Sequence, residues 1–226
     1  MGAVLVAAGR STRMGFDKLW ADLNGRPVLA WSLEALAASA EVDRLVVVTS
    51  PDRADDAWRM VGRMAPARLR ALTVLGGERR RDSVAAGLAA LDGCTWVLVH
   101  DAARPFLTDD VIRRGLDEVR QTGACVAALP ARDTIKRVAP DRTVLETLPR
   151  EELWTVQTPQ VFRRELVLSA LAATDDDATD EASLIERTGG TVRVFAGDVT
   201  CFKITTPEDL EIARSLLLRQ PRPAGW

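Results

Sequence analysis

The sequence predicts an α/β protein with a mostly parallel sheet flanked by helices on both faces. Short apolar runs rich in Val and Leu alternate along the chain with segments whose apolar residues recur at helical spacing. Strand followed by helix, repeated, is typical of a parallel sheet, because parallel neighbours need a long crossover that a helix commonly supplies. The alternation lapses near residue 133, where a different pattern predicts a hairpin.

The first 130 residues supply most of the predicted elements. The expected buried strands are 3–8, 44–49, 69–75, 96–100 and 124–129. The helical patterns between them are 28–38, 53–64, 83–91 and 110–121. Pro27 and Asp82 stand where helix starts are favoured, because proline lacks an N–H that the first turn would leave unpaired and aspartate accepts from free N–H groups.

Polar and apolar residues alternate on either side of Pro140 and Asp141, in 134–138 and 143–147. This pattern predicts a β-hairpin. The segment is too short to be a domain, so we expect it to project from the sheet as a β-arm over about 133–154.

The later elements complete one predicted domain. They are helices at 163–173 and 179–188, a strand at 191–195 and a final helix from Thr206 to Leu218. We interpret 1–219 as a single domain that includes the arm. The tail 220–226 contains two prolines and a glycine and is expected to be loose.

Composition excludes several functional classes. Lys plus Arg number 30 against 32 for Asp plus Glu, so the chain has no general positive field for nucleic acid. No segment approaches the ~18 uninterrupted apolar residues of a membrane span. Three widely spaced cysteines fit buried free thiols in a reducing cytoplasm. The only histidine, His100, excludes a multi-histidine metal centre within this sequence and is expected to be a hydrogen-bonded interior residue rather than a general base.

The first candidate for phosphate chemistry follows the first strand. Small residues at Ala7, Ala8 and Gly9 let backbone N–H groups approach phosphate oxygens closely. Arg13 and Lys18 add the positive charge that a triphosphate requires. On these residues alone, a strand-to-helix turn with solvated basic side chains explains the pattern about as well, and neither the Walker nor the G-x-G-x-x-G pattern is present.

A second candidate follows the strand 96–100. Asp101 stands where it can meet a metal ion or substrate hydroxyls, and Arg104 can clamp a phosphate with two hydrogen bonds. The alternative is that Asp101 only caps a turn and pairs with Arg104.

The third candidate is a glycine turn that runs from Gly76 into a helix start. Ser83 and the helix N-terminus can bind a base or a phosphate. A loop with an Asp82 cap and three solvated arginines, 79–81, fits nearly as well. Lys203, just before the last helix, can point towards the same cleft. Residues 179–183 form a capping box that needs no function.

Taken in order, these motifs resemble the 2-C-methyl-D-erythritol 4-phosphate cytidylyltransferases of the non-mevalonate isoprenoid pathway. The matching motifs are Ala7-Ala-Gly with Arg13-Met and Lys18, Gly76-Gly with Arg80 and Asp82-Ser-Val, His100-Asp-Ala-Ala-Arg-Pro, Arg132-Asp-Thr, Arg150 with Leu153-Trp, Gln157-Thr-Pro-Gln, Thr179-Asp-Glu-Ala-Ser, and Lys203 with Pro207-Glu-Asp-Leu. Each motif alone is weak, and the specificity comes from their shared order and compatible spacing over nearly the whole chain.

The resemblance implies a Rossmann-like nucleotidyltransferase fold and a homodimer whose arms reach across to the partner. It implies that Arg13 and Lys18 are catalytic and stabilise charge at the α-phosphate of CTP. It places CTP against Ala7, Ala8, Gly9, Gly77, Glu78, Ser83 and Ala102. It places methylerythritol phosphate among Asp101, Arg104, Thr134, Arg150, Thr179 and Lys203, with Thr134 and Arg150 from the partner's arm. Mg²⁺ is expected to bridge the triphosphate oxygens, without an assigned protein ligand.

Two departures from the family concern the first loop. Ser11 stands where the family commonly has a second glycine, and the segment 14–18 is short. Because Arg13 and Lys18 remain, these departures bear on the conformation of the loop more than on activity. The alternatives are a ribitol-5-phosphate cytidylyltransferase, or a nucleotide-binding protein of the same fold without turnover.

Overall fold

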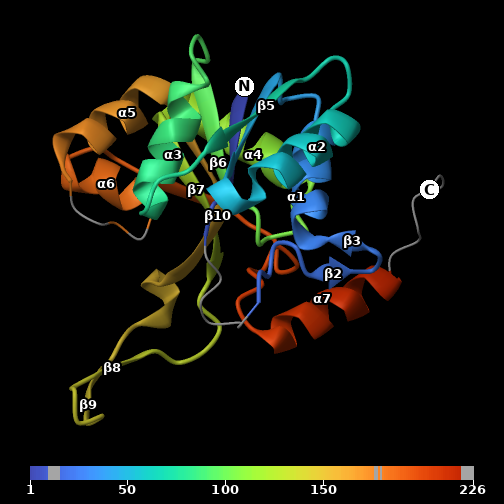
Figure 1. Cartoon of the computed structure of the whole chain (residues 1–226). Helices are drawn as coiled ribbons and strands as arrows, with labels where there is room; N and C mark the ends of the chain where they lie inside the picture. Colours follow the sequence, from blue (N-terminus) through green and yellow to red (C-terminus); the bar gives the residue numbers. More distant parts are fainter. Residues whose placement is uncertain (10–15, 176–177, 179, 220–226) are drawn as a thin grey trace.

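The computed structural model describes residues 1–9, 16–175, 178 and 180–219. Its centre is a seven-stranded sheet in the order β11-β7-β10-β6-β1-β4-β5, with helices on both faces (Figure 1). The predicted loose tail, 220–226, lies outside the described residues.

One half of the sheet is parallel. Its strands are β1 (Gly2–Ala7), β4 (Arg44–Thr49), β5 (Arg70–Leu75) and β6 (Trp96–Asp101). β1 pairs with both β4 and β6, so the carboxyl ends of these strands lie at one edge. β5 is the edge strand, and Leu72 and Leu75 are exposed on it. The prediction of a buried strand there is therefore wrong about burial, although the strand itself is present.

The other half contains a strand that the sequence did not predict. β10 (Trp154–Arg163) lies antiparallel between β6 and β7 (Ala124–Pro130). The register shifts between Val156 and Gln160, around the cis peptide of Thr158 and Pro159. β11 (Arg193–Ala196) completes the sheet parallel to β7.

The helices divide between the two faces. They are α1 (Val28–Ala38), α2 (Ala54–Met64) after the short η1 (Pro51–Arg53), α3 (Arg80–Ala89), α4 (Asp109–Thr122), α5 (Arg164–Ala173), α6 (Glu181–Arg187) and α7 (Pro207–Arg219). One apolar cluster joins Leu5 to helices α1, α2, α4 and α7, and the other joins Val4 to α3, α5 and α6. Neighbouring strand residues face opposite sides of a sheet, which explains why β1, β4, β6, β7 and β10 contribute residues to both clusters. Within the described ranges, no helix is long and apolar enough to cross a membrane.

Two helix starts differ from the prediction by a few residues. α3 begins at Arg80, and the Asp82 carboxylate accepts from the Arg79 backbone N–H at 3.2 Å, so Asp82 sits inside the first turn as the second half of a capping box. At α6 the cap is Asp180, whose carboxylate accepts from the Ser183 N–H at 3.1 Å. Pro27 directly precedes α1, as predicted.

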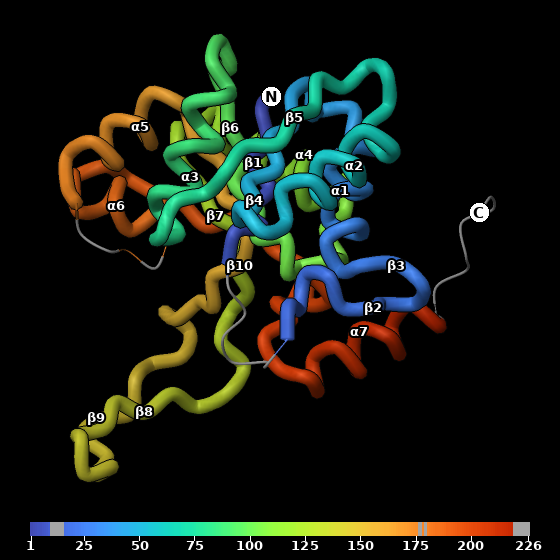
Figure 2. Tube along the Cα trace, viewed as in Figure 1, coloured from blue at the N-terminus to red at the C-terminus, as the bar shows by residue number. Residues whose placement is uncertain are grey.

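The predicted hairpin is confirmed. Strands β8 (Lys136–Val138) and β9 (Val144–Thr147) pair antiparallel and extend away from the sheet (Figures 1 and 2). The short η2 (Arg150–Glu152) leads back into β10. A second small ribbon, β2 (Asp22–Leu23) with β3 (Arg26–Pro27), precedes α1.

Candidate active site

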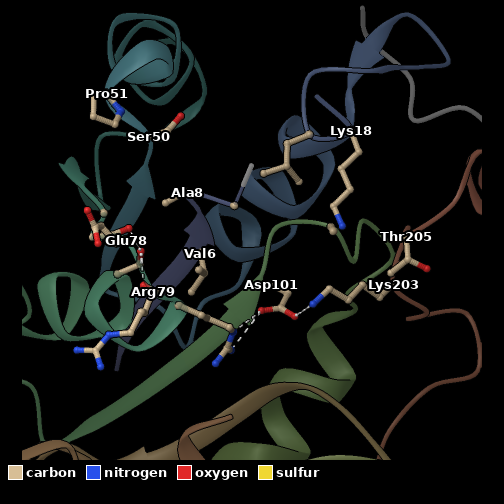
Figure 3. Close-up of a pocket in the computed structure, with 17 residues that line it drawn as sticks. Val6, Ala8, Lys18, Ser50, Pro51, Glu78, Arg79, Asp101, Lys203 and Thr205 are labelled. Carbon is tan, nitrogen blue, oxygen red and sulfur yellow. Dashed lines mark hydrogen bonds and ion pairs between the residues drawn. The ribbon is translucent and has the colours of Figure 1, made fainter. Parts of the chain in front are cut away.

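A cavity of about 530 Å³ opens at the carboxyl ends of β1, β4, β5 and β6. Open α/β sheets bind ligands at this edge, because the loops that leave parallel strands converge there. Figure 3 shows the cavity between Lys18 on one side and Glu78 and Arg79 on the other. The lining residues are Val6, Ala8, Gly9, Lys18, Leu19, Ser50, Pro51, Gly76, Gly77, Glu78, Arg79, Arg80, Ser83, Asp101, Ala103, Lys203 and Thr205.

Two glycines bring the start of α3 against the loop after β1. A Cβ on Gly76 would lie 2.5 Å from the Cβ of Ala8 and 2.6 Å from the Oγ of Ser83. A Cβ on Gly77 would lie 2.4 Å from the Cβ of Asp82. Contacts this short do not occur between real Cβ atoms and their neighbours, so any larger residue would push these segments apart. The two glycines therefore allow the turn after β5 to pack directly against Ala8 and the start of α3.

Four charged side chains form one cluster, and three of them, Arg80, Asp101 and Lys203, line the cavity. Arg80 Nη1 donates to both Glu181 carboxylate oxygens, at 2.6 and 2.9 Å. The Nη2 and Nε of Arg80 donate to Asp101 Oδ1, at 3.2 and 3.4 Å. Lys203 Nζ donates to Asp101 Oδ2 at 2.7 Å, and Figure 3 shows these two side chains pointing at one another. The two cations thus occupy both oxygens of one carboxylate.

Burial and charge oppose each other in this cluster. Burial alone would raise the pKa of the Asp101 carboxyl, but Arg80 and Lys203 outweigh it and hold that pKa well below its usual range. Burial lowers the pKa of Arg80, yet Asp101 and Glu181 raise it further than burial lowers it. For Glu181 burial dominates and raises the pKa, with Arg80 opposing. Asp101 is therefore an anion at neutral pH.

The solvated-arginine interpretation of 79–81 is wrong. Arg79 pairs with Asp82 at 2.9 Å and with Asp175 at 2.8 Å, while Arg81 donates to the Leu171 carbonyl at 2.8 Å from a buried position. These bonds of Arg79 and Arg81 fix the start of α3.

The side chains of Asp101 and Arg104 do not pair, although the sequence allows such a pairing: among the described residues, the ion pairs of Asp101 are with Arg80 and Lys203. Arg104 Nη1 donates instead to the Cys201 carbonyl at 2.9 Å, and only the backbone of the turn joins the two residues, through a 3.0 Å bond from the Arg104 N–H. Arg104 does not line the cavity.

His100 is an interior residue, as predicted. It is fully buried, with Nε2 at 3.1 Å from the Arg104 carbonyl and Nδ1 at 3.0 Å from the Thr158 hydroxyl. A carbonyl only accepts, so Nε2 carries the proton and Nδ1 accepts from Thr158. The Thr158 hydroxyl in turn accepts from the Asp101 N–H at 3.1 Å. This chain of hydrogen bonds ties β10 to the loop after β6.

We expect the His100 environment to make folding pH-dependent. Burial is the main cause that lowers the pKa of His100 from 6.5 to about 4. Between these pH values the unfolded chain binds a proton at His100 that the folded protein does not. The contribution of His100 to the free energy of unfolding is therefore fully present above pH 6.5 and decreases as the pH falls towards 4. A gap of about 2.5 pH units corresponds to about 3 kcal/mol of unfolding free energy.

The control is His100→Gln, whose amide has a donor and an acceptor group but does not titrate. Urea unfolding at pH 7 and at pH 4 should show a fall for the wild type that exceeds the fall for His100→Gln by about 3 kcal/mol. Parallel losses in the two proteins would show that His100 does not carry this pH dependence.

The cavity brings together part of the predicted site. Eight predicted residues line it: Ala8, Gly9, Lys18, Gly77, Glu78, Ser83, Asp101 and Lys203. Five others do not line it: Ala7, Ala102, Arg104, Thr134 and Arg150. Of these, Thr134 is exposed, and Arg150 is exposed at the foot of the arm, where Nη1 donates to the Arg132 carbonyl at 3.0 Å. Arg13 and Thr179 lie outside the described residues.

Sequence reasoning missed several residues of the site. Ser50 and Pro51 line the cavity directly after β4, and the rule that ligands bind beyond strand ends could have found them. Glu181 had no such signal, because in the sequence it is one residue of a capping box. Its contact with Arg80 spans 101 positions and exists only in the folded chain.

The fold and the cavity define a class of protein. A mostly parallel sheet with a glycine turn, cations and a carboxylate at its carboxyl edge is typical of α/β proteins that bind phosphorylated substrates at that edge. A family model, "2-C-methyl-D-erythritol 4-phosphate cytidylyltransferase" (IspD), matches residues 1–219. The chain belongs to this family.

Relatives and solved structures agree with that assignment. A 2-C-methyl-D-erythritol 4-phosphate cytidylyltransferase of Dehalococcoides mccartyi is 45% identical over 218 residues, covering 96% of each chain. One from Halalkalibacterium halodurans is 39% identical and covers 97% of each chain. The crystal structure of the cytidylyltransferase from Thermus thermophilus superposes with a TM-score of 0.76 at 34% identity, covering 95% of this chain and 97% of that one. The 4-diphosphocytidyl-2C-methyl-D-erythritol synthase of Anaerococcus prevotii reaches a TM-score of 0.86 at 28% identity, covering 96% and 98%. The predicted Rossmann-like nucleotidyltransferase fold is confirmed.

Proposed function

We infer that this chain transfers the cytidylyl group of CTP to 2-C-methyl-D-erythritol 4-phosphate, in the non-mevalonate isoprenoid pathway. The products are 4-diphosphocytidyl-2-C-methyl-D-erythritol and pyrophosphate. The family match over residues 1–219 supports this reaction over the alternatives of ribitol 5-phosphate transfer and of binding without turnover. The structural observation that carries it is the cavity, whose lining combines a glycine turn with Lys18, Asp101 and Lys203.

In this proposal the acceptor phosphate attacks the α-phosphorus of CTP. A new P–O bond forms to the acceptor oxygen, and the bond from the α-phosphorus to the oxygen that bridges to the β-phosphorus breaks. The electron pair leaves with pyrophosphate. The attacking phosphate is already an anion, so no strong general base is required, and His100, buried and hydrogen-bonded at both nitrogens, takes no part.

The protein groups then have two tasks. Lys18, together with Arg13 from the segment outside the described residues, stabilises the charge that develops on the α-phosphate. The main-chain turn at Ala7, Ala8 and Gly9 binds CTP together with Gly77, Glu78, Ser83 and Ala102; of these residues, Ala7 and Ala102 do not line the cavity. Asp101 and Lys203, which line the cavity, position methylerythritol phosphate together with Arg104, Thr134, Arg150 and Thr179; of these four, Arg104, Thr134 and Arg150 do not line the cavity of their own chain.

Magnesium fits the cavity as an ion held mainly by the substrate. Among the described residues, no cluster of three or more His, Cys, Asp or Glu side chains is suited to a metal. Of the two carboxylates in the lining, Asp101 already has both oxygens bonded to Arg80 and Lys203, so Glu78 is the one that would meet Mg²⁺, which in such sites commonly binds one or two carboxylates together with phosphate oxygens and water. When bound, it would neutralise triphosphate charge.

A pyrophosphate-release assay with CTP and magnesium tests the proposed reaction. We expect release that depends on 2-C-methyl-D-erythritol 4-phosphate and is much weaker with ribitol 5-phosphate as the acceptor. Equal or better use of ribitol 5-phosphate would change the assigned acceptor. No release with either acceptor, from folded protein, would contradict a catalytic role.

We also propose a homodimer in which the arms complete the partner's sites. The arm is a two-stranded ribbon with exposed apolar side chains at Val138, Val144 and Leu145, and such a ribbon gains stability by packing on another surface. Arg150 at its foot does not line the cavity of its own chain, which supports donation to another copy.

Free thiols at Cys94, Cys125 and Cys201 support a cytoplasmic location.

Mixing two variants of low activity tests whether the arm donates Arg150 to the partner's site. Lys18→Ala and Arg150→Ala variants, each weak alone, should regain activity after subunit exchange, because one site in the mixed dimer keeps both residues. Size-exclusion chromatography with differently tagged chains must show that mixed dimers form. If they form and activity does not return, Arg150 acts within its own chain or not at all.

A further inference from the structure

Glu181 is the most buried member of the charged cluster, and it does not line the cavity. Its side chain is 1% exposed, against 25% for Arg80, 12% for Asp101 and 38% for Lys203. It reaches the cluster from the first residue of α6, on the far side of Arg80 from Asp101. Among the described residues, Glu181 is joined to the lining of the cavity by its bonds to Arg80.

The geometry at Arg80 divides its guanidinium between two carboxylates. Nη1 is taken up by both oxygens of Glu181, which leaves only Nη2 and Nε for Asp101. Both of these nitrogens bond the same oxygen, Oδ1, so Oδ2 stays available to Lys203 at 2.7 Å. The planar fork of an arginine can instead bind both oxygens of one carboxylate when no competitor holds it.

The charge balance of the cluster depends on Glu181. Arg80 and Lys203 are matched by Asp101 and Glu181, with both carboxylates largely buried. Without the charge of Glu181, Arg80 would have Asp101 as its remaining anionic partner in the cluster. Its guanidinium would then turn towards both oxygens of Asp101 and displace Lys203 from Oδ2.

We propose that Glu181 is a positioning residue for the acceptor side of the cavity, where it holds Arg80 so that Asp101 and Lys203 stay correctly placed for the sugar phosphate. This inference rests on the proposed function, because it assigns Asp101 and Lys203 to the acceptor. Gly77, Glu78 and Ser83, which bind CTP in the proposed function, share no hydrogen bond or ion pair with Glu181 among the described residues, and the bonds of Arg79 and Arg81 hold the start of α3 without it. Loss of the Glu181 charge therefore affects the two substrates unequally.

The first test is Glu181→Gln, which keeps the size of the side chain and removes its charge. We expect the KM for 2-C-methyl-D-erythritol 4-phosphate to rise about tenfold or more, while the KM for CTP changes by less than about twofold. The matched control is Glu186→Gln, the same substitution at an exposed position of the same helix, which should leave both values unchanged. An unchanged acceptor KM, or an equal rise in both values, would overturn the proposal.

A double-mutant cycle with Arg80→Met separates positioning from a general structural role. If Glu181 acts through Arg80, Glu181→Gln should add nothing to the acceptor KM once Arg80 is Met. Additive losses would refute action through Arg80. Urea unfolding of each variant shows which proteins are folded under assay conditions.

If Glu181→Gln does not fold, Arg80→Lys provides the same test. A lysine keeps the positive charge but cannot span two carboxylates with a planar fork, so the selective rise in acceptor KM should recur. A normal acceptor KM in Arg80→Lys would overturn the proposal. If the wild-type protein does not use methylerythritol phosphate, both the proposed function and this inference are wrong. If the wild type is active and Glu181→Gln has the same acceptor KM, only this inference is wrong.

Discussion

The Lys18→Ala variant is expected to lower kcat by about 10²–10³-fold, the effect of removing one donor that stabilises transition-state charge, or about 3–4 kcal/mol. Lys18 lines the cavity, half-buried, from the segment that follows β1. In the proposed reaction the barrier comes from bringing an anionic acceptor to a triphosphate, and a cation beside the α-phosphate offsets that repulsion most strongly as the new bond forms.

Steady-state kinetics with both substrates saturating measures this effect. Arg113→Ala is the control, because it removes a 58%-exposed cation from α4, outside the cavity lining, and should leave kcat unchanged. Lys18→Arg should retain more activity than Lys18→Ala, since it keeps the charge. Turnover near the wild-type rate in a folded Lys18→Ala protein would remove Lys18 from the catalytic residues.

The Phe162→Ala variant is expected to lose about 3–5 kcal/mol of unfolding free energy, the usual cost of deleting a fully buried aromatic side chain. Phe162 is 0% exposed and belongs to the cluster that joins the sheet to α3, α5 and α6. It lies on β10, so the resulting cavity would open beneath the strand that connects β6 to β7.

Urea denaturation followed by circular dichroism tests this prediction. Trp58→Ala removes an even larger aromatic side chain, but one that is 69% exposed on α2, and it should change stability by less than about 1 kcal/mol. Similar losses of unfolding free energy in the two variants would mean that the burial of Phe162 does not determine the cost of removing its side chain.

Local patterns predicted most of the elements. The helix at 28–38 agrees with α1 residue for residue, and the strand at 44–49 agrees with β4. The hairpin is confirmed around Pro140 and Asp141. These features depend on apolar periodicity and turn residues, which act over a few neighbouring positions and can therefore be recognised in the sequence.

β10 escaped prediction because its sequence lacks a strand signal. Its centre is Gln157, Thr158, Pro159 and Gln160, polar or proline positions that do not favour a central strand. The structure accommodates them with a register shift, with bonds from Gln157 to Asp198 and from Gln160 to Asp180, and with the Thr158 contacts to His100 and Asp101. The polar groups are paired by distant segments, so the strand is a product of tertiary structure.

The candidate site divides in the same way. By itself the sequence determined which residue types are available for phosphate chemistry and that these residues follow strands. These two facts were enough to predict that Lys18, Gly77 and Asp101 lie near one edge of the sheet. Only the tertiary structure decided which charges meet. The Arg80–Glu181 and Lys203–Asp101 bonds join positions 101 and 102 residues apart. Such side chains are not neighbours in the sequence, so their ion pairs form only when the packing of the fold removes water and fixes the distance between them.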